Sequence, residues 1–427
     1  MHVNNIQTLT TAGFNVVKIW NTKKGALLYK TKKRIKLNMK IALLTETYLP
    51  YINGVVTHVS MLKDGLEKLG HTVLVVTADH TTRRHYIKDG VMHCPAVRFK
   101  RIYNFGVAMP VSRKRVKLLR EFNPDIIHIH NEFGIGLWGI SAAKTLKKPL
   151  VYTLHTMYDE YLYYIAPRKL INLARRFSHK YTGYFAKRAA ALTGPSKKCS
   201  EYFIKSGISK QVNVIPNSVE LESFLPENIK KLPSSEIRKK YGIGEHILLT
   251  CFVGRLGKEK SVDVLLDYWA KSVTPQDNIM LMIIGDGPSK IELEEQVRSL
   301  GISGMVMFAG KVQHCELPPY YAECDAYITA SLSDTNSISM LEGMAAGLPV
   351  FSRLDRLNED QVIENENGFI YRDAEEMGIK LRQLRDMKDY DVLQLKQRVS
   401  QSVTKNGCID LATNVLLVYT GIIKENK

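Results

Sequence analysis

Two cationic side chains frame a glycine-bearing loop that could bind a diphosphate. The loop is residues 254–260 (GRLGKEK), and it directly follows an apolar run typical of a buried strand. Arg255 and Lys260 would then lie at the carboxyl end of a strand, the edge at which open α/β sheets bind ligands. A solvated basic loop is the plainer alternative, but the position after a strand favours a phosphate-binding role.

Two carboxylates eight residues apart, Asp334 and Glu342, form a second candidate site. Asp334 lies in a polar loop, and Glu342 lies in a predicted helix rich in small residues. Carboxylates accept hydrogen bonds readily from sugar and ribose hydroxyls. They could also be ordinary surface acids, but the small residues at 343–347 favour close backbone packing beside them.

A third candidate is Asn53-Gly54, just after the first predicted strand. A glycine-bearing turn that opens a helix presents free backbone N–H groups to an anion, helped by the helix dipole. The stretch is not G-x-G-x-x-G, so it gives little support for a dinucleotide cofactor. A plain turn between strand and helix explains it equally well.

The elements that must position these residues alternate between short apolar strands and helices. Apolar runs occupy residues 41–45, 72–77, 125–130, 150–154, 190–193 and 212–215, and again 247–253, 280–284, 305–309, 326–329 and 349–352. Continuous apolar runs are typical of parallel strands buried on both faces. Helical segments between them, such as 59–69, 262–272 and 291–300, complete two α/β, doubly wound domains.

The boundaries between the predicted units follow changes in composition. We predict a basic N-terminal extension (1–38), a first domain (39–217), a linker (218–245) and a second domain with a terminal helix at 411–423 (246–427). A length of 427 residues is too great for a single core and agrees with this division.

Charge is distributed unevenly between the two halves of the chain. Residues 1–218 carry 36 Lys and Arg against 11 Asp and Glu, a net charge of +25, whereas 219–427 carry 24 against 31, a net charge of −7. Only the first half should therefore seek anionic surfaces. No apolar run approaches the ~18 residues of a membrane span, and six cysteines without a C-x-x-C pair favour a reduced cytosolic compartment.

The three stretches, taken in order with I-I-G-D-G-P at 283–288 and A-A-G-L-P-V at 345–350, resemble the family 4 retaining glycosyltransferases. The resemblance spans about residues 39–425. It implies the GT-B fold, in which two Rossmann-like domains face each other across a cleft and a nucleotide-sugar lies mainly on the second. It also implies that no metal and no cofactor take part, because the nucleotide-sugar is a co-substrate.

The resemblance assigns roles to the candidate residues. Arg255 and Lys260 would bind the diphosphate, Glu342 the ribose, and Asp334 the sugar hydroxyls, although the family places Glu where this chain has Asp334. Further donor-binding residues implied are Asn53, Gly54, Asn336, Ser337 and Ile338.

A histidine, His155, follows the strand at 150–154, where its side chain can reach a ligand in the cleft. The family places a histidine at this site near the transferred sugar, which makes His155 the leading catalytic candidate. The stretch H-T-M-Y-D-E-Y-L-Y-Y at 155–164 is similar to that of bacterial 1,2-diacylglycerol 3-glucosyltransferases. This implies a hexose, glucose from a UDP donor, transferred to a diacylglycerol-type lipid, with Asp159 positioning the acceptor hydroxyl.

A basic helix at 168–188 could dock on an anionic bilayer. Apolar residues recur on one face at helical spacing, at Leu170, Leu173, Ala174, Phe177, Tyr181, Tyr184 and Phe185. Cations predicted to face the membrane are Arg168, Lys169, Arg175, Arg176 and Lys180, with a second cluster at Arg113, Lys114, Arg115, Lys117 and Arg120. We expect the apolar stripe to pack inward while the charge faces lipid, which predicts a cytoplasmic protein peripheral to the inner face of the cell membrane.

Two patterns are discounted, and other functions stay open. His128 and His130 could share a metal but have no evident third ligand, and the D-x-D at Asp389 and Asp391 lies in a helical tail. A polyprenol-linked or soluble acceptor is the nearer alternative to a lipid. A nucleic-acid-binding module is the distant one, since a basic half is present without a zinc finger or an RNP pattern.

Overall fold

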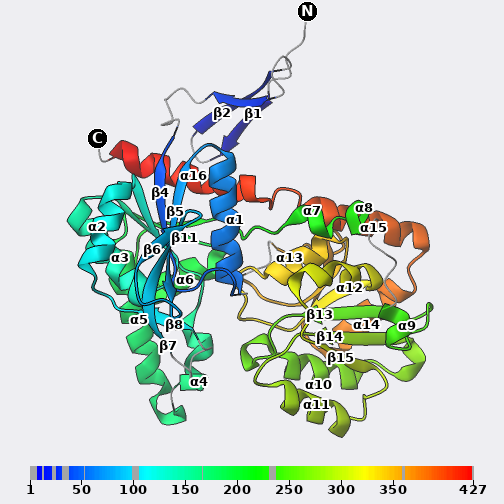
Figure 1. Ribbon diagram of the computed structural model, residues 1–427. Coiled ribbons are helices and arrows are strands. Elements are labelled where there is room, and N and C mark those ends of the chain that lie inside the picture. Colours follow the sequence, from blue (N-terminus) through cyan, green and yellow to red (C-terminus); the bar gives the residue numbers. More distant parts are fainter. Residues whose placement is uncertain are drawn as a thin grey trace, which may run out of the picture.

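A computed structural model shows two α/β domains side by side (Figure 1). It describes residues 7–11, 14–21, 26–30, 38–51, 53–98, 105–165, 167–229, 237–357 and 361–425. The predicted α/β class with two doubly wound, parallel-sheet domains is confirmed.

The first domain is built on a largely parallel sheet in the order β12-β11-β10-β9-β4-β5-β7-β6, with β8 paired to β7. Its strands are β4 (Lys40–Leu44), β5 (Thr72–Asp79), β6 (Tyr86–Lys88), β7 (Val91–Arg98), β8 (Gly106–Ala108), β9 (Ile126–Ile129), β10 (Leu150–Thr153), β11 (Ala191–Gly194) and β12 (Val212–Val214). Its helices are α1 (Gly54–Lys68), α2 (Arg113–Phe122), α3 (Gly134–Leu146), α4 (Leu162–Ile165), α5 (Ile171–Arg188) and α6 (Lys197–Lys205), with 3-10 turns η1 (Tyr158–Tyr161) and η2 (Arg168–Leu170).

The second domain has a six-stranded parallel sheet in the order β15-β14-β13-β16-β17-β18. Its strands are β13 (Leu248–Val253), β14 (Ile279–Ile284), β15 (Val306–Gly310), β16 (Ala326–Thr329), β17 (Val350–Arg353) and β18 (Gly368–Tyr371). Its helices are α7 (Leu221–Phe224), α8 (Pro226–Ile229), α9 (Ile237–Lys240), α10 (Val262–Ser272), α11 (Lys290–Ser299), α12 (Leu317–Glu323), α13 (Ile338–Ala345), α14 (Ala374–Arg385) and α15 (Asp389–Ser402), with 3-10 turns η3 (Lys258–Lys260), η4 (Pro275–Asp277) and η5 (His314–Glu316).

Both sheets reverse their strand order beside the first strand of the domain. In the first domain the reversal lies between β4 and β9, and in the second it lies between β13 and β16. Loops at the carboxyl ends of such strand pairs diverge and leave a crevice in which α/β proteins bind ligands. The loops after these four strands are therefore the places to look for a site.

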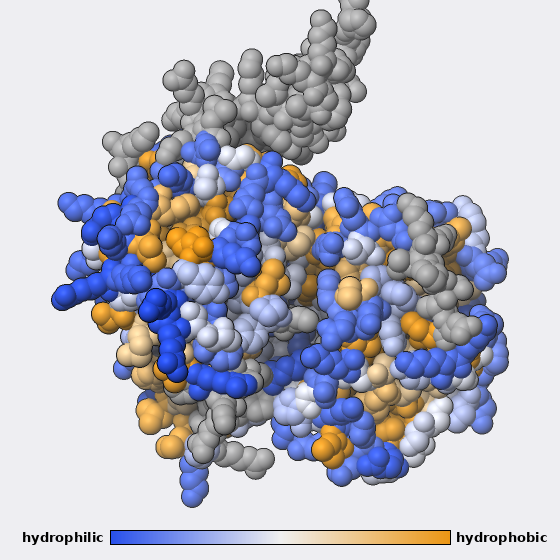
Figure 2. Space-filling model, viewed as in Figure 1, coloured by the Kyte–Doolittle hydropathy of each residue, from blue (hydrophilic) through white to orange (hydrophobic). Residues whose placement is uncertain are grey.

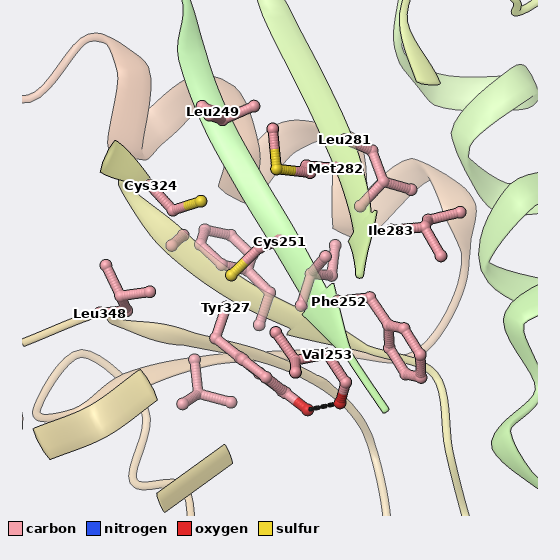
Figure 3. Packing of buried hydrophobic residues seen from close by; sticks show 14 of the residues in the cluster. Leu249, Cys251, Phe252, Val253, Leu281, Met282, Ile283, Cys324, Tyr327 and Leu348 are labelled. Carbon is pink, nitrogen blue, oxygen red and sulfur yellow. Dashed lines mark hydrogen bonds between the residues drawn. The ribbon is translucent and has the colours of Figure 1, made fainter. Parts of the chain in front are cut away.

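The core of the second domain fixes the end of β13 (Figure 3). Tyr327 of β16 is buried, and its hydroxyl donates to the carbonyl of Val253 at 3.2 Å. Ser339 of α13 donates to the same carbonyl at 2.8 Å. Because Val253 is the last residue of β13, these two bonds set where the loop at 254–260 begins.

Two boundaries differ from the prediction. The terminal helix, α16 (Cys408–Glu425), was expected in the second domain, but it packs against α1 in the first (Figure 1). Its apolar face, with Leu411, Val415 and Tyr419, covers the sheet beside β4 and β5. The predicted linker is also wrong in extent, because Val219 and Phe224 are buried in the core of the second domain.

The described part of the N-terminal extension contains three strands, β1 (Gln7–Thr11), β2 (Phe14–Asn21) and β3 (Ala26–Lys30). They pair antiparallel as a sheet of their own. Among the described helices, none is both long and apolar enough to span a membrane.

Candidate active site

The start of α1 is closed by its own N-cap, Asn53. The Asn53 side chain accepts a hydrogen bond from the backbone N–H of Val56 at 3.0 Å and donates to Thr47. Helix capping uses the side-chain amide, so an asparagine at this position is accounted for without a bound ligand. Gly54 follows it, and a side-chain carbon at Gly54 would lie 3.8 Å from Ile338 of the second domain, so these two predicted donor-binding residues meet across the cleft.

Three histidines meet at the carboxyl ends of β9 and β10 and on α1. Nδ1 of His130 lies 3.1 Å from Nε2 of His155, and the rings of His58 and His155 are 4.6 Å apart. The structure therefore gives His155 two histidine neighbours, neither of which was assigned to the site. His58 was missed, although a histidine four residues after Gly54 falls near the same face of the helix.

Burial controls the charge of these imidazoles. It lowers the pKa of His58 to about 4, although a hydrogen bond with Asn217 favours the charged form and raises the pKa in part. It also lowers the pKa of His155 and of His130 well below the ordinary value, and the neighbouring histidines lower both further. All three rings are therefore neutral at pH 7 and act as hydrogen-bonding groups.

The same three histidines are the described side chains best placed to hold a metal ion. Their ligand nitrogens all lie within 4.8 Å of one another. The sequence offered His128 as the only partner of His130, whereas the structure brings His58 and His155 to it. His128 is occupied elsewhere, by Tyr419 and Thr153 at 2.6 Å each. Neutral imidazoles suit a transition metal, and metal independence stays a prediction.

Both cations of the loop at 254–260 contact carboxylates. Arg255 donates to Glu259 at 3.2 Å, and Lys260 forms an ion pair with Asp334. Burial would raise the pKa of Asp334, but the Lys260 ammonium and its hydrogen bond outweigh this and lower it. Asp334 is therefore a carboxylate at neutral pH, and it lies next to the cation predicted to bind the diphosphate.

Glycines allow a second loop to approach this one. A side-chain carbon at Gly285 would lie 1.8 Å from the carbonyl of Gly254, and one at Gly287 would lie 2.3 Å from that of Leu256. The I-I-G-D-G-P stretch is thus pressed against the basic loop, and a larger residue would push the two loops apart.

The loop between β16 and α13, residues 330–337, is called the donor loop below. Ser337 caps α13 by accepting from Met340 N–H at 3.4 Å. Both carbonyl oxygens of Asn336 accept hydrogen bonds from Asn217, the side-chain oxygen from N–H at 2.8 Å and the backbone oxygen from the amide at 2.7 Å. Asn336 is therefore tied to the segment that joins the domains, a role that local sequence could not reveal.

Glu342 is buried on α13 behind a histidine. Nε2 of His314 lies 2.9 Å from one carboxylate oxygen, and the hydroxyl of Tyr321 donates to the other at 3.3 Å. The hydrogen bond with Glu342 raises the pKa of His314. His314 was not predicted, and it separates Glu342 from solvent in this structure, since its own side chain is 39% exposed and that of Glu342 only 4%.

Asp159 is engaged away from the histidine cluster. One oxygen lies 2.9 Å from His179, and Arg175 is 3.7 Å away. Both partners belong to α5, so the carboxylate anchors η1 to that helix. The acceptor-positioning role predicted for Asp159 stays a prediction.

The face of α5 differs from the expectation. Leu170, Leu173, Phe177 and Tyr184 are exposed rather than packed inward, and the buried residues of α5 begin only at Ser178. Figure 1 shows α5 extending past the sheet, so its first turns have little to cover. Apolar and hydrophilic residues consequently interleave on this surface (Figure 2).

The predicted basic residues are mostly exposed around this helix. Lys169, Arg175, Arg176 and Lys180 are exposed on η2 and α5, and Arg113, Lys114, Lys117 and Arg120 on α2. The side chain of Arg168 lies outside the described part of the structure. Arg115 is a correction, because it is buried and lies over the Trp138 ring.

Two buried acids near the cleft were missed. Glu46 follows β4 and accepts from Ala108 N–H at 2.6 Å and Ile135 N–H at 2.8 Å, and burial raises its pKa to about 7. Glu132 accepts from Tyr152 at 2.5 Å and also from Tyr158. Glu46 therefore holds backbone segments in place, and Glu132 holds two tyrosines. The D-x-D at Asp389 and Asp391 is exposed at the start of α15.

Comparisons with known proteins bear on this arrangement. Residues 52–223 match the family model "Glycosyltransferase Family 4", and residues 233–400 match "Glycosyl transferases group 1". The alpha-monoglucosyldiacylglycerol synthase of Acholeplasma laidlawii is 31% identical over 344 residues, 79% of this chain and 86% of the relative. The synthase of the same name from Streptococcus pneumoniae (strain ATCC BAA-255 / R6) is 32% identical over 341 residues, 78% of this chain and 75% of the relative.

A solved structure shares the whole architecture. Anabaena Alr3699/HepE in complex with UDP and glucose aligns with a TM-score of 0.67 at 17% identity, covering 90% of this chain and 100% of that one. At this identity the likeness shows the fold alone, and it confirms the predicted GT-B arrangement.

Proposed function

Since the chain belongs to glycosyltransferase family 4, we propose that it transfers glucose from UDP-glucose to a diacylglycerol-type lipid with retention of configuration. The observation that carries the proposal is the similarity, over 79% of the chain, to a synthase whose name gives both glucose and diacylglycerol. The same name specifies an alpha product. Because the sugar of UDP-glucose is also α-linked, an α product from that donor requires retention.

The second domain supplies the donor contacts. Arg255 and Lys260 would balance the charge of the departing diphosphate, which is the charge that develops in the transition state. An ammonium has three donors, so Lys260 can contact the diphosphate while it stays paired with Asp334. Asp334 would then accept from sugar hydroxyls and Glu342 from the ribose.

The first domain supplies the acceptor side. His155 is neutral at pH 7 because burial lowers its pKa. A neutral imidazole can hydrogen-bond a sugar hydroxyl without placing a positive charge beside an anomeric carbon that itself becomes electron-poor in the transition state. The acceptor hydroxyl would attack from the face that the diphosphate leaves.

The α5 surface supports a membrane acceptor. Leu173 is 64% exposed and Phe177 is 69% exposed, and both lie among Arg176, Lys180 and their neighbours. Exposed apolar side chains surrounded by cations fit the interface of an anionic bilayer, where each cation contributes about 1 kcal/mol. On this ground we propose that the protein acts at the cytoplasmic face of the membrane, whose leaflet carries the anionic lipids.

The test is one assay on the purified full chain. It is incubated with a panel of UDP- and GDP-sugars and diacylglycerol in anionic mixed micelles, with and without a chelator, while nucleotide release and lipid mass are followed. We expect a monoglucosylated lipid from UDP-glucose alone, with an α anomeric signal in NMR and a rate that the chelator leaves unchanged.

Other outcomes would redirect the proposal. Nucleotide release without a glycolipid would discard the lipid and favour a soluble or polyprenol-linked acceptor. A β-linked product would discard retention, and a rate abolished by the chelator would discard metal independence and turn attention to His58, His130 and His155. No release with any donor, together with a salt-sensitive gel shift, would favour nucleic-acid binding.

A further inference from the structure

Lys198 is a buried lysine of the first domain whose acceptors lie in the second. It stands near the start of α6, and its side chain is 3% exposed. The ammonium donates to the carbonyls of Leu332 at 2.6 Å and Asp334 at 2.9 Å, and it forms an ion pair with Asp355. An ammonium carries three donors, so these acceptors use all of them.

Two of the three acceptors belong to the donor loop. The carbonyl of Asp334 is held by Lys198, while the carboxylate of the same residue pairs with Lys260. The direction of that carboxylate depends on the backbone that carries it. A side chain of the first domain thus helps to set a carboxylate of the second.

The donor loop is held by the first domain at a second point. Asn217, where the chain leaves the first domain, contacts Asn336 with two hydrogen bonds of 2.8 and 2.7 Å. Asn217 also lies 3.0 Å from Nδ1 of His58. The loop is therefore held at two points, by a side chain of the first domain and by the segment that joins the domains.

We propose that Lys198 is a positioning residue that sets the donor loop for the sugar when the two domains close. The proposal rests on the proposed function. A buried ammonium is costly unless it is paired and hydrogen-bonded, so its contacts favour the closed arrangement and the loop conformation together. Arg255, Lys260 and Glu342 all belong to the second domain, so the nucleotide part of the donor should depend on Lys198 less than the sugar does.

The test separates the sugar from the nucleotide. In the full chain, Lys198→Met keeps the length of the side chain and removes its charge and donors. We expect the affinity for UDP-glucose and kcat/KM for transfer to fall roughly 10- to 100-fold, the range for hydrogen bonds to a charged group. The affinity for UDP, measured by calorimetry, should change less than about threefold.

Three further variants sharpen the result. Lys205→Met removes an exposed cation at the other end of α6 and should match the wild type in every measurement. Lys198→Arg keeps the charge and should recover part of the UDP-glucose affinity. Asp355→Asn retains an oxygen that can accept from Lys198 and leaves both loop carbonyls in place, but it removes the anionic partner of the ammonium. Its loss of UDP-glucose affinity should therefore be measurable but smaller than that of Lys198→Met.

Each outcome decides between roles. Equal loss of UDP and UDP-glucose affinity, or a loss in Asp355→Asn as large as in Lys198→Met, would make Lys198 a plain contact between domains and overturn the proposal. Unchanged transfer by Lys198→Met would also overturn it. If instead the wild type transfers no glucose and binds UDP-glucose no better than UDP, the proposed function fails, and the premise of the Lys198 role fails with it.

Discussion

At the scale of single residues, burial decides what the cleft histidines can do. His58, His130 and His155 lie within hydrogen-bonding or ring contact of one another, and each is neutral because burial lowers its pKa. A neutral ring offers one donor and one acceptor. Neutral rings can therefore position a ligand by hydrogen bonds, but they cannot attract a phosphate by charge.

Replacing His155 should separate transfer from donor binding. In His155→Ala the contact near the transferred sugar is lost, while Arg255, Lys260 and Glu342 keep their places. We expect kcat for glucose transfer to fall at least about 100-fold, within the range for loss of a positioned catalytic group. Affinity for UDP, measured by calorimetry, should be unchanged. Full transfer activity in this variant would remove His155 from the catalytic residues.

The buried His58 should make stability depend on pH. Its folded pKa of about 4 lies below the ordinary 6.5, so the unfolded chain binds more protons between these values. The unfolding free energy should fall as pH drops from 6.5 to 4, by roughly 3 kcal/mol for this residue.

The His58→Gln variant isolates that contribution. Glu46, whose pKa is raised to about 7, acts in the opposite direction in both proteins and cancels in the comparison. Urea denaturation at pH 7, 6 and 5 should show a shallower loss of stability in His58→Gln than in the wild type. Parallel pH profiles would mean that His58 is charged or exposed in the folded protein.

Residues that act locally were predicted, and residues that act at a distance were not. Arg255, Lys260 and Asp334 sit in short motifs whose backbone setting follows from the strand before them. Lys198 and Asn217 act through contacts with residues more than 100 positions away. Local spacing carries no information on such pairs. The helix-capping contact between Asn53 and Val56 is local, so it could have been expected from the sequence.

At the scale of elements, α5 joins an exposed surface of basic and apolar side chains to a buried one. Its carboxyl half buries Phe185 and Ala186 against the first domain, while its amino half leaves Leu173 and Phe177 in solvent. Helical spacing predicted the stripe, but it could not show where the neighbouring sheet ends. The exposed half of α5 therefore presents apolar side chains as well as the basic ones that the sequence indicated.

Charge reversal on α5 should abolish membrane binding and spare the donor site. Arg175 is left intact because it lies near Asp159, so the variant is Arg176→Glu with Lys180→Glu. Each lost cation costs about 1 kcal/mol near an anionic surface, and each new anion adds repulsion. Vesicle sedimentation with anionic lipid should show at least about a tenfold loss of binding, with UDP affinity unchanged.

The matched control reverses two exposed cations of the second domain, Arg298 and Lys311, and makes the same change in net charge. It should keep vesicle binding near the wild-type level. If the control loses binding to the same extent, overall charge rather than α5 holds the protein on the membrane.

At the scale of the whole molecule, the chain crosses between domains twice. It leaves the first domain near Asn217 and returns at α16, and the two crossings touch where Asn406 donates to the carbonyl of Asn217 at 3.3 Å. The parallel sheets were predictable from apolar runs. The return of α16 was not, because its apolar stripe is equally compatible with either domain.

The seam between α1 and α16 should tolerate no added volume. A side-chain carbon at Gly65 would lie 2.0 Å from the carbonyl of Cys408. Gly65→Ala must therefore push the helices apart, at about 1–3 kcal/mol for an overpacked contact. Thermal unfolding followed by circular dichroism should show a lower Tm.

Gly421→Ala is the matched change on α16. No atom lies within 4 Å of a side-chain carbon added there, so the substitution should gain about 0.5–1 kcal/mol of helix propensity. A Tm that falls as much in Gly421→Ala as in Gly65→Ala would show that the seam is not the cause.

The position of α16 also sets the order in which a growing chain can finish its domains. Residues such as Ile41 and Leu43 of β4 share a core with Leu411 and Tyr419 of α16. At 5–20 residues per second, a ribosome needs roughly 10–40 s to pass from the end of the first domain to α16. The domain that begins synthesis first is therefore completed last, and its uncovered apolar face remains accessible to chaperones on the nascent chain throughout that interval.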